Sequence, residues 1–229
     1  MSFALLIIFM FVAFGLTTLF RRWVDIPTLL GVAIGCAVNA NFFTPLKYGL
    51  LVGPFIFSIE AVLYTLFMYT VVVRVLDYGY QAAKKMTFTT VAAIIISAII
   101  ELFAELAAKQ QAVEAFKDFL YYLFSSIGTI LGVWVMIFIT IKLRKIKVSD
   151  YIILPLVIAI STIIHAAFYY GGIALVEMRG DVYTIKMLLG ALVGKSVCIA
   201  LADICYFINK RLWLPLTLVS SQKKNKIEK

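Results

Sequence analysis

The sequence predicts an all-α integral membrane protein, a polytopic bundle of about seven transmembrane helices, with six as the alternative count. Of its 229 residues, 63% are hydrophobic, whereas soluble domains usually have about 45–50%, and the mean hydropathy is +1.02. The hydrophobic residues also form continuous runs of about 20 residues, the length that a helix needs to cross a bilayer. Strands of outer-membrane barrels are only about ten residues long and alternate in polarity, so these runs exclude a barrel.

The spans form a single transmembrane domain over residues 1–207, followed by a basic cytoplasmic tail over residues 208–229, of which we expect residues 220–229 to be disordered. They are predicted to cover residues 2–20, 26–46, 52–73, 87–106, 119–141, 151–175 and 185–207. Near the third span, Gly53 and Pro54 could interrupt the start of the helix. All connections are short, so no soluble domain fits between the spans.

Basic residues alternate between the connections and thereby orient the chain. The odd-numbered connections carry two, three and four Lys or Arg residues and the tail carries six, whereas the even-numbered connections carry only Lys47, Lys109, Lys117, Arg179 and Lys186. The positive-inside rule therefore places the N-terminus outside and the C-terminus in the cytoplasm of an inner (cell) membrane. This distribution also explains the net charge of +9 without a nucleic-acid partner.

The first span precedes Arg21 and Arg22, which is the reverse of the charge order of a signal peptide. We therefore expect this span to remain as a helix.

The last span, residues 185–207, contains both a cation and an anion, Lys195 and Asp203. Ionisable residues inside a membrane are rare and usually face a protein interior or an aqueous cavity. These two are eight residues apart, too far along a helix to pair directly. Each therefore needs a partner elsewhere, either in a structural ion pair or in a solute. Gly190 and Gly194 form a GxxxG face for close helix packing.

Polar side chains in the second and third spans are further candidates for a site. Asn39 and Asn41 precede Pro45, and Glu60 precedes Tyr64 by one helical turn. Buried amides in lipid must bond either to other helices or to a solute, and a carboxylate at this depth is a candidate for a proton or solute site.

His165 is the only histidine of the chain. A multi-histidine metal site is therefore impossible, and a histidine-based triad is poorly supported. Ser161 and Thr162 precede His165 by one turn, and Tyr169 and Tyr170 follow it. A core histidine and a histidine lining a cavity with these tyrosines fit the pattern equally well.

Several chemical functions are opposed by the absence of their motifs. The chain has no G-x-S-x-G, no H-E-x-x-H, no pair of intramembrane aspartates and no glycine-rich phosphate loop. Cys36, Cys198 and Cys205 all lie in apolar runs, so neither a disulfide framework nor a zinc cluster is supported. We therefore expect no enzyme activity, no metal, no cofactor and no ATP-driven function.

Two parts of the chain resemble one family of membrane proteins. The residues that carry the likeness are FGL at 14–16, Asn41 and Lys47, Leu63 and Tyr64, Tyr78 and Gly79, 83–85, and ALADICYF at 200–207. In this order they resemble the bacterial queuosine-precursor (7-deazapurine) transporters, formerly described as vitamin-uptake transporters. The second patch is similar to the family's A-L-x-D-T-P-x-x-Y, and Asp203 occupies the position of its aspartate.

The chain also departs from this family. Val71, Val72 and Leu76 stand where the family has T-D-x-L-x-E, and the fifth and sixth spans lack its S-Q-x-x-D. If the chain belongs to the family, it is a divergent member.

The resemblance implies a transporter of a small organic solute, a purine-like base, that is not powered by ATP itself. We expect its path to be lined by Asn39, Asn41, Glu60, Tyr64, His165, Lys195 and Asp203. The amides and Glu60 would hydrogen-bond the solute, Tyr64 would stack on it, and Lys195 and Asp203 would form a charged gate. The partners are then the solute, the lipid bilayer, and either a second copy or a membrane subunit. The alternatives are a non-transporting subunit of a separate energising complex and, more weakly, a membrane enzyme acting on lipid or quinone.

Overall fold

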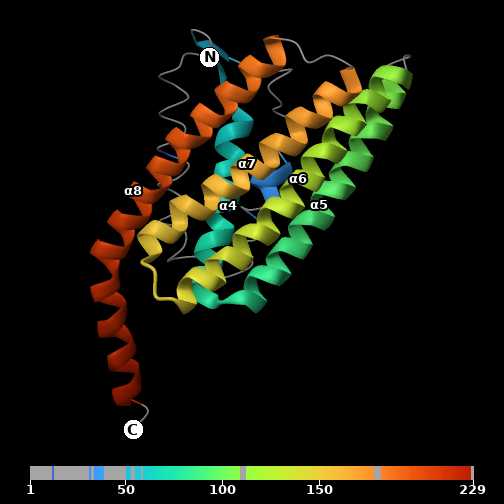
Figure 1. Cartoon of the computed structure of the whole chain (residues 1–229). Coiled ribbons are helices and arrows are strands. Elements are labelled where there is room, and N and C mark those ends of the chain that lie inside the picture. Colours follow the sequence, from blue (N-terminus) through green and yellow to red (C-terminus); the bar gives the residue numbers. More distant parts are fainter. Residues whose placement is uncertain are drawn as a thin grey trace.

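The computed structural model describes residues 12, 31, 34–38, 50–52, 55–57, 59–108, 112–177 and 182–227. Within these ranges the chain is helical apart from one short strand pair (Figure 1). The long helices are α4 Ile59–Tyr78, α5 Tyr80–Ala108, α6 Ala112–Lys145, α7 Asp150–Glu177 and α8 Val182–Ile227. The predicted helical architecture is thus observed, whereas the first expected span and most of the second lie outside the described residues.

A short strand pair stands at the start of the expected third span, within a fold that is otherwise helical as predicted. Strand β1 (Leu50–Val52) pairs antiparallel with β2 (Phe55–Phe57), with Val52 opposite Phe55. Only Gly53 and Pro54 separate the two strands in sequence, and both residue types favour turns. Strand β2 packs against α8, and α4 then begins at Ile59.

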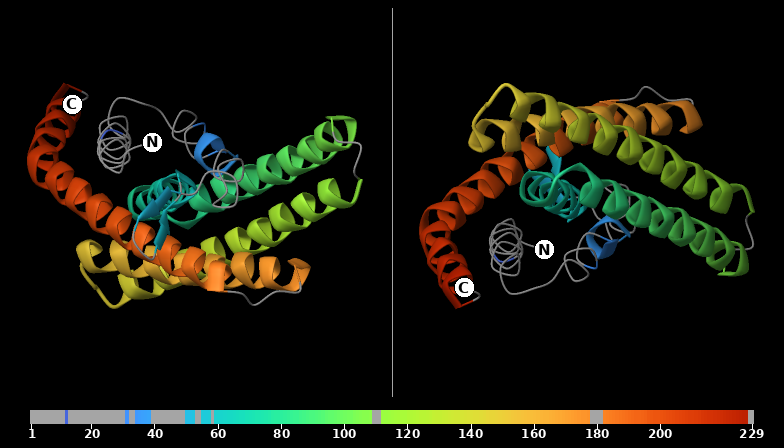
Figure 2. Two further views of the ribbon diagram at one scale, coloured as in Figure 1. Left: turned by 90° about the horizontal axis from the view of Figure 1, so that it is seen from above. Right: turned by 90° about the horizontal axis from the view of Figure 1, so that it is seen from below.

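Helix α4 is the central helix of the described bundle. Every residue from 60 to 76 is buried except Leu63, which is half-buried. The helix contacts α5, α6, α7 and α8, and Figure 2 shows it between α8 and α5, with α6 and α7 along one side. A helix that is apolar on all sides is typical of such a buried position.

Four of the described helices contain segments long and apolar enough to cross a membrane, and they indicate a membrane protein. These segments are Thr87–Ala104, Phe116–Lys145, Asp150–Glu177 and Ile185–Ile208. Each overlaps one of the last four predicted spans. A helix forms its backbone hydrogen bonds within one segment, as the hydrocarbon region requires.

The break between α4 and α5 and the turn between α6 and α7 lie at the same end of the bundle (Figure 1). Gly79 separates α4 from α5 with a φ of 79°, and Lys147 has a φ of 59° in the turn between α6 and α7. Both values lie in the left-handed region, which glycine adopts without the steric penalty of a Cβ. The basic residues flanking these breaks are therefore on one side of the bundle.

The end of the chain differs from the expected disordered tail. Helix α8 continues to Ile227, well past the apolar segment that ends at Ile208. The helix includes Pro215 and continues past it, and no further glycine or proline follows that residue.

Helices α6 and α7 pack closely because α6 carries glycines where the two helices meet. A Cβ on Gly128 would lie 3.2 Å from the His165 Cα, and a Cβ on Gly132 would lie 2.6 Å from the Ser161 Oγ. Gly128 and Gly132 thus form a small-residue face of the GxxxG type. A glycine of α7 also contacts a side chain of α6. The ring of Phe124 packs against Gly172, and its Cγ would lie 2.3 Å from a Cβ added there.

Polar contacts join α6 and α7 at both of their ends. Arg144 Nε lies 3.8 Å from Asp150 Oδ1 at one end, and Lys117 Nζ lies 3.5 Å from Glu177 Oε2 at the other. The Tyr121 hydroxyl also donates a hydrogen bond to Glu177. With the glycine contacts between them, these ends hold α7, and hence His165, in a defined position on α6.

Candidate functional site

A buried ion pair joins the central helix to the last helix. Lys195 Nζ of α8 donates to Glu60 Oε1 of α4 at 2.9 Å, and the exposed fractions of the two side chains are 0% and 6%. Lys195 lies ten residues after the start and thirteen before the end of the apolar segment Ile185–Ile208. The pair therefore lies near the middle of this segment, where an unpaired charge is most costly.

His165 of α7 extends this pair into a chain of polar groups. Its Nδ1 lies 3.3 Å from Lys195 Nζ, and its Nε2 lies 3.2 Å from the hydroxyl of Ser125 on α6. An ammonium group can only donate hydrogen bonds, so we assign Nδ1 as the acceptor. The neutral imidazole then carries its proton on Nε2 and donates it to Ser125.

Aromatic rings enclose the buried charges. The ring of Tyr64 stacks on His165 with a centroid separation of 4.0 Å and an interplanar angle of 29°. Lys195 Nζ lies 4.4 Å from the centroid of the same Tyr64 ring, a cation–π contact that stabilises a desolvated ammonium. Tyr169 continues the stack beyond His165 at 5.9 Å.

A small cavity adjoins these side chains. Its volume is about 10 Å³, and its polar lining comes from Glu60, Tyr64, Ser125, Thr129 and His165. A single water molecule needs about 10–15 Å³, so the space accommodates one water and no purine-sized solute. The cluster is therefore closed in this conformation.

The structure brings together four of the seven predicted site residues: Glu60, Tyr64, His165 and Lys195. They come from three helices, and Glu60 is the partner that the sequence analysis required for Lys195. Asn39 and Asn41 lie outside the described residues, although the helical residues 34–38 precede them directly and Ala37 lines the cavity.

Asp203 does not join this cluster. Its Oδ1 is buried and has no hydrogen-bond partner among the residues that the structure describes. Asp203 lies eight residues beyond Lys195 on α8, which is more than two turns. The spacing along one helix keeps Lys195 and Asp203 apart, as expected from the sequence, and their role as a charged gate stays a prediction.

Helix α6 contributes residues that the sequence analysis did not select. Ser125 bonds His165, Thr129 lines the cavity, and Gly128 and Gly132 let α7 approach. Their spacing of three and four residues places these small and polar side chains on one face of an apolar span. That periodic pattern is the signal that could have identified them.

Comparison of the chain with models of protein families, with curated proteins and with solved structures finds no match. Among the residues that the structure describes, no group of three or more His, Cys, Asp and Glu residues could hold a metal ion. The function must therefore be argued from the cluster itself.

Proposed function

We propose that this chain is a membrane carrier for a small organic solute, and that the buried pair of Lys195 and Glu60 is its solute or coupling site. The observation that carries the proposal is a fully buried ion pair near the middle of an apolar segment, bonded to a histidine. Replacing a buried ion pair by apolar residues often leaves stability unchanged or raises it. Stability alone is thus a weak reason to keep such a pair, whereas solute and proton pathways require ionisable groups at this depth.

The chemistry of the cluster suits an exchange of partners. Lys195 and Glu60 satisfy each other while the site is closed, and each would need a new partner once α4 and α8 separate. A solute with hydrogen-bond donors could bond Glu60, and one with acceptors could bond Lys195. Charged groups that change partners in this way couple the opening of a site to its occupancy.

A purine-like base is the cargo that we propose, on the resemblance to queuosine-precursor transporters. A planar heterocycle could replace one member of the stack of Tyr64, His165 and Tyr169 while its N–H groups bond Glu60. The closed cavity of about 10 Å³ requires the surrounding helices to move before such a base enters, as expected for a carrier that alternates between states.

The electrostatics of His165 favour this proposal over a membrane enzyme. In a serine hydrolase a carboxylate accepts a hydrogen bond from the histidine Nδ1 and stabilises the imidazolium that forms. Here the ammonium of Lys195 lies 3.3 Å from Nδ1 and would oppose an imidazolium. The hydrogen bond between Ser125 and His165 therefore lacks the charge arrangement that activates a serine.

For the whole chain we propose seven spans in an inner membrane, with the N-terminus outside and the C-terminus in the cytoplasm. The support is that the basic residues near Gly79 and Lys147 lie at one end of the bundle (Figure 1). Labelling of single cysteines placed in successive connections with a membrane-impermeant reagent tests this topology. Accessibility from outside at the α6–α7 turn would contradict it.

Uptake by the purified chain in liposomes tests the transport proposal. We expect accumulation of a labelled 7-deazaguanine-type base, and its loss in Glu60→Gln and Lys195→Met, while the exposed variant Lys145→Gln transports like the wild type. Uptake by neither the wild type nor Lys145→Gln would contradict transport of this base by the chain alone. Co-purification of a stoichiometric membrane partner, with uptake restored by adding it, would instead support the subunit function.

A further inference from the structure

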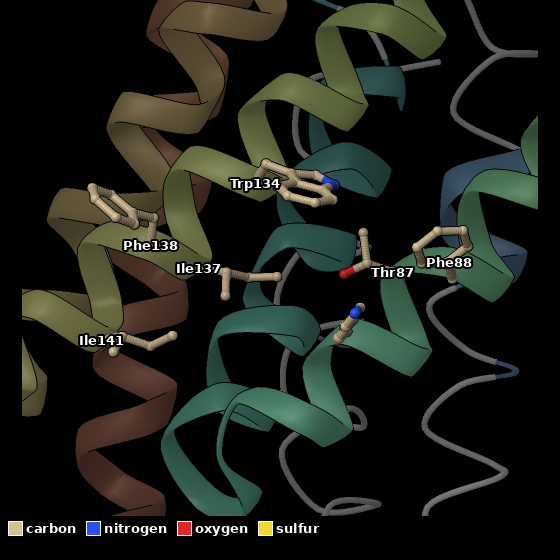
Figure 3. A pocket seen from close by; sticks show the side chains of 7 residues that line it. Thr87, Phe88, Trp134, Ile137, Phe138 and Ile141 are labelled. Atoms are coloured by element: carbon tan, nitrogen blue, oxygen red, sulfur yellow. The ribbon is translucent and has the colours of Figure 1, made fainter.

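We propose that a groove on the outer face of α5 and α6 binds one anionic phospholipid, with an acyl chain in the groove and the phosphate at Lys84. The groove has a volume of about 380 Å³, within the range of about 300–1,000 Å³ that is usual for ligand sites. Figure 3 shows Thr87 and Phe88 of α5 on one side and Trp134 and Ile137 of α6 facing them. It is separate from the cluster around Lys195.

The walls of the groove suit an acyl chain. Apart from Lys84 and Thr87, they consist of Phe88, Trp134, Ile137, Phe138 and Ile141. The exposed fractions are 64% for Phe88, 56% for Trp134 and 57% for Phe138. Because α5 and α6 both contain membrane-spanning segments, this exposed apolar surface meets lipid.

The charges at one end of the groove select the head group. Lys84 lines the groove three residues before the apolar segment that starts at Thr87, so its ammonium lies at the depth of the head groups. Lys142 Nζ lies 4.3 Å from the centroid of the Phe138 ring, which is itself part of the wall. Among the described residues no carboxylate lines the groove, so a phosphate beside Lys84 and the nearby Lys142 meets no competing anion from them.

The dimensions agree with this orientation. In the wall of α6, Trp134 lies seven positions before Ile141, which is near the lysines, and this is about 10 Å along a helix. A chain entering beside Lys84 and Lys142 would therefore pass Phe138 and reach the indole of Trp134. This depth makes Trp134 a reporter for the bound chain.

Fluorescence quenching by brominated lipids tests the proposal. In the full-length chain with Trp23→Phe and Trp213→Phe, Trp134 is the only tryptophan. Liposomes contain either phosphatidylglycerol or phosphatidylcholine brominated on the acyl chain, at equal mole fractions. We expect phosphatidylglycerol to quench Trp134 at a lower mole fraction than phosphatidylcholine.

The lysine variants identify the source of the preference. A lysine near a membrane surface contributes about 1 kcal/mol toward anionic lipid, so Lys84→Gln and Lys142→Gln should each reduce the preference about fivefold. Lys145→Gln removes an exposed lysine of the same helix end that, unlike Lys142, has no cation–π contact with the groove wall among the described contacts, and it should retain the preference. Thermal unfolding in the same lipid checks that all variants are folded.

Two other results would overturn the proposal. Equal quenching by the two lipids would mean that ordinary boundary lipid passes the groove without a phosphate site. Absence of quenching by either would mean that protein covers the groove, and a concentration-dependent change in oligomeric state would identify a second copy.

Discussion

Lys195 Nζ lies 2.9 Å from Glu60 Oε1, a contact between residues 135 positions apart in sequence that has almost no access to solvent. It joins α8 to the central helix α4 and holds His165 and Tyr64 around one ammonium group. Both the proposed function and the energetics of the bundle depend on this contact.

Removal of one partner of this pair should be strongly destabilising. Glu60→Gln leaves the ammonium of Lys195 buried without a counter-charge, and we expect a loss of about 3–5 kcal/mol in the free energy of unfolding. Glu60→Leu combined with Lys195→Met should lose much less, because no charge remains buried. Unfolding in mixed micelles measures all variants, and additive effects of the single substitutions would contradict this coupling.

The pair of Lys117 and Glu177 is the matched comparison. It has similar chemistry, at 3.5 Å, but its side chains are 41% and 36% exposed. Solvent screening should limit the effect of Lys117→Met to about 1 kcal/mol or less. A loss as large as that of Glu60→Gln would show that burial does not decide the strength of these pairs.

Gly132→Ala should separate α6 from α7. The added Cβ would lie 2.6 Å from Ser161 Oγ and 3.0 Å from the Ser161 carbonyl oxygen, and backbone cannot move as easily as a side-chain end. We expect a loss of about 1–3 kcal/mol, measured by thermal unfolding in detergent. The control is Gly171→Ala, since a Cβ there meets nothing within 4 Å, and stability should stay the same or rise by up to about 1 kcal/mol. Equal effects at both positions would count against close packing at Gly132.

Gly79→Ala should destabilise the break between α4 and α5. Gly79 has a φ of 79° and donates a hydrogen bond from its N–H to the Val75 carbonyl at 3.0 Å. A Cβ in this left-handed conformation costs roughly 1–2 kcal/mol. Lys147 already has a left-handed φ of 59°, so Lys147→Gly should be neutral or stabilising. In unfolding experiments we expect Gly79→Ala to lower the free energy of unfolding and Lys147→Gly to leave it unchanged or raise it. A Gly79→Ala variant as stable as the wild type would contradict this prediction.

Asp203→Asn should have the opposite effect to Glu60→Gln. The Oδ1 of Asp203 is buried without a hydrogen-bond partner, so removing the charge relieves a desolvation penalty. We expect unchanged or higher stability, by up to about 1 kcal/mol, and unchanged uptake of solute. Loss of uptake with normal stability would return Asp203 to the functional site as first predicted.

Sequence reasoning identified which residues of the last spans have unusual chemistry, but not which of them meet. Lys195 and Asp203 share one apolar helical segment, yet only Lys195 reaches Glu60. Ser125 was missed because serine in an apolar span is unremarkable until its neighbours Gly128, Thr129 and Gly132 are seen on the same face.

The sequence by itself determined the class of the protein and the extent of its last four spans, because the length and apolarity of a segment decide whether it can cross a bilayer. It also determined that Lys195 needed a partner elsewhere, in an ion pair or in a solute, since an unpaired charge in hydrocarbon is too costly. Only the tertiary structure decided that this partner is Glu60, that α4 occupies the centre, and that α7 seats His165 against the glycines of α6. Those outcomes depend on contacts between helices far apart in sequence. No local pattern specifies how each helix is rotated about its axis or shifted along it relative to its neighbours.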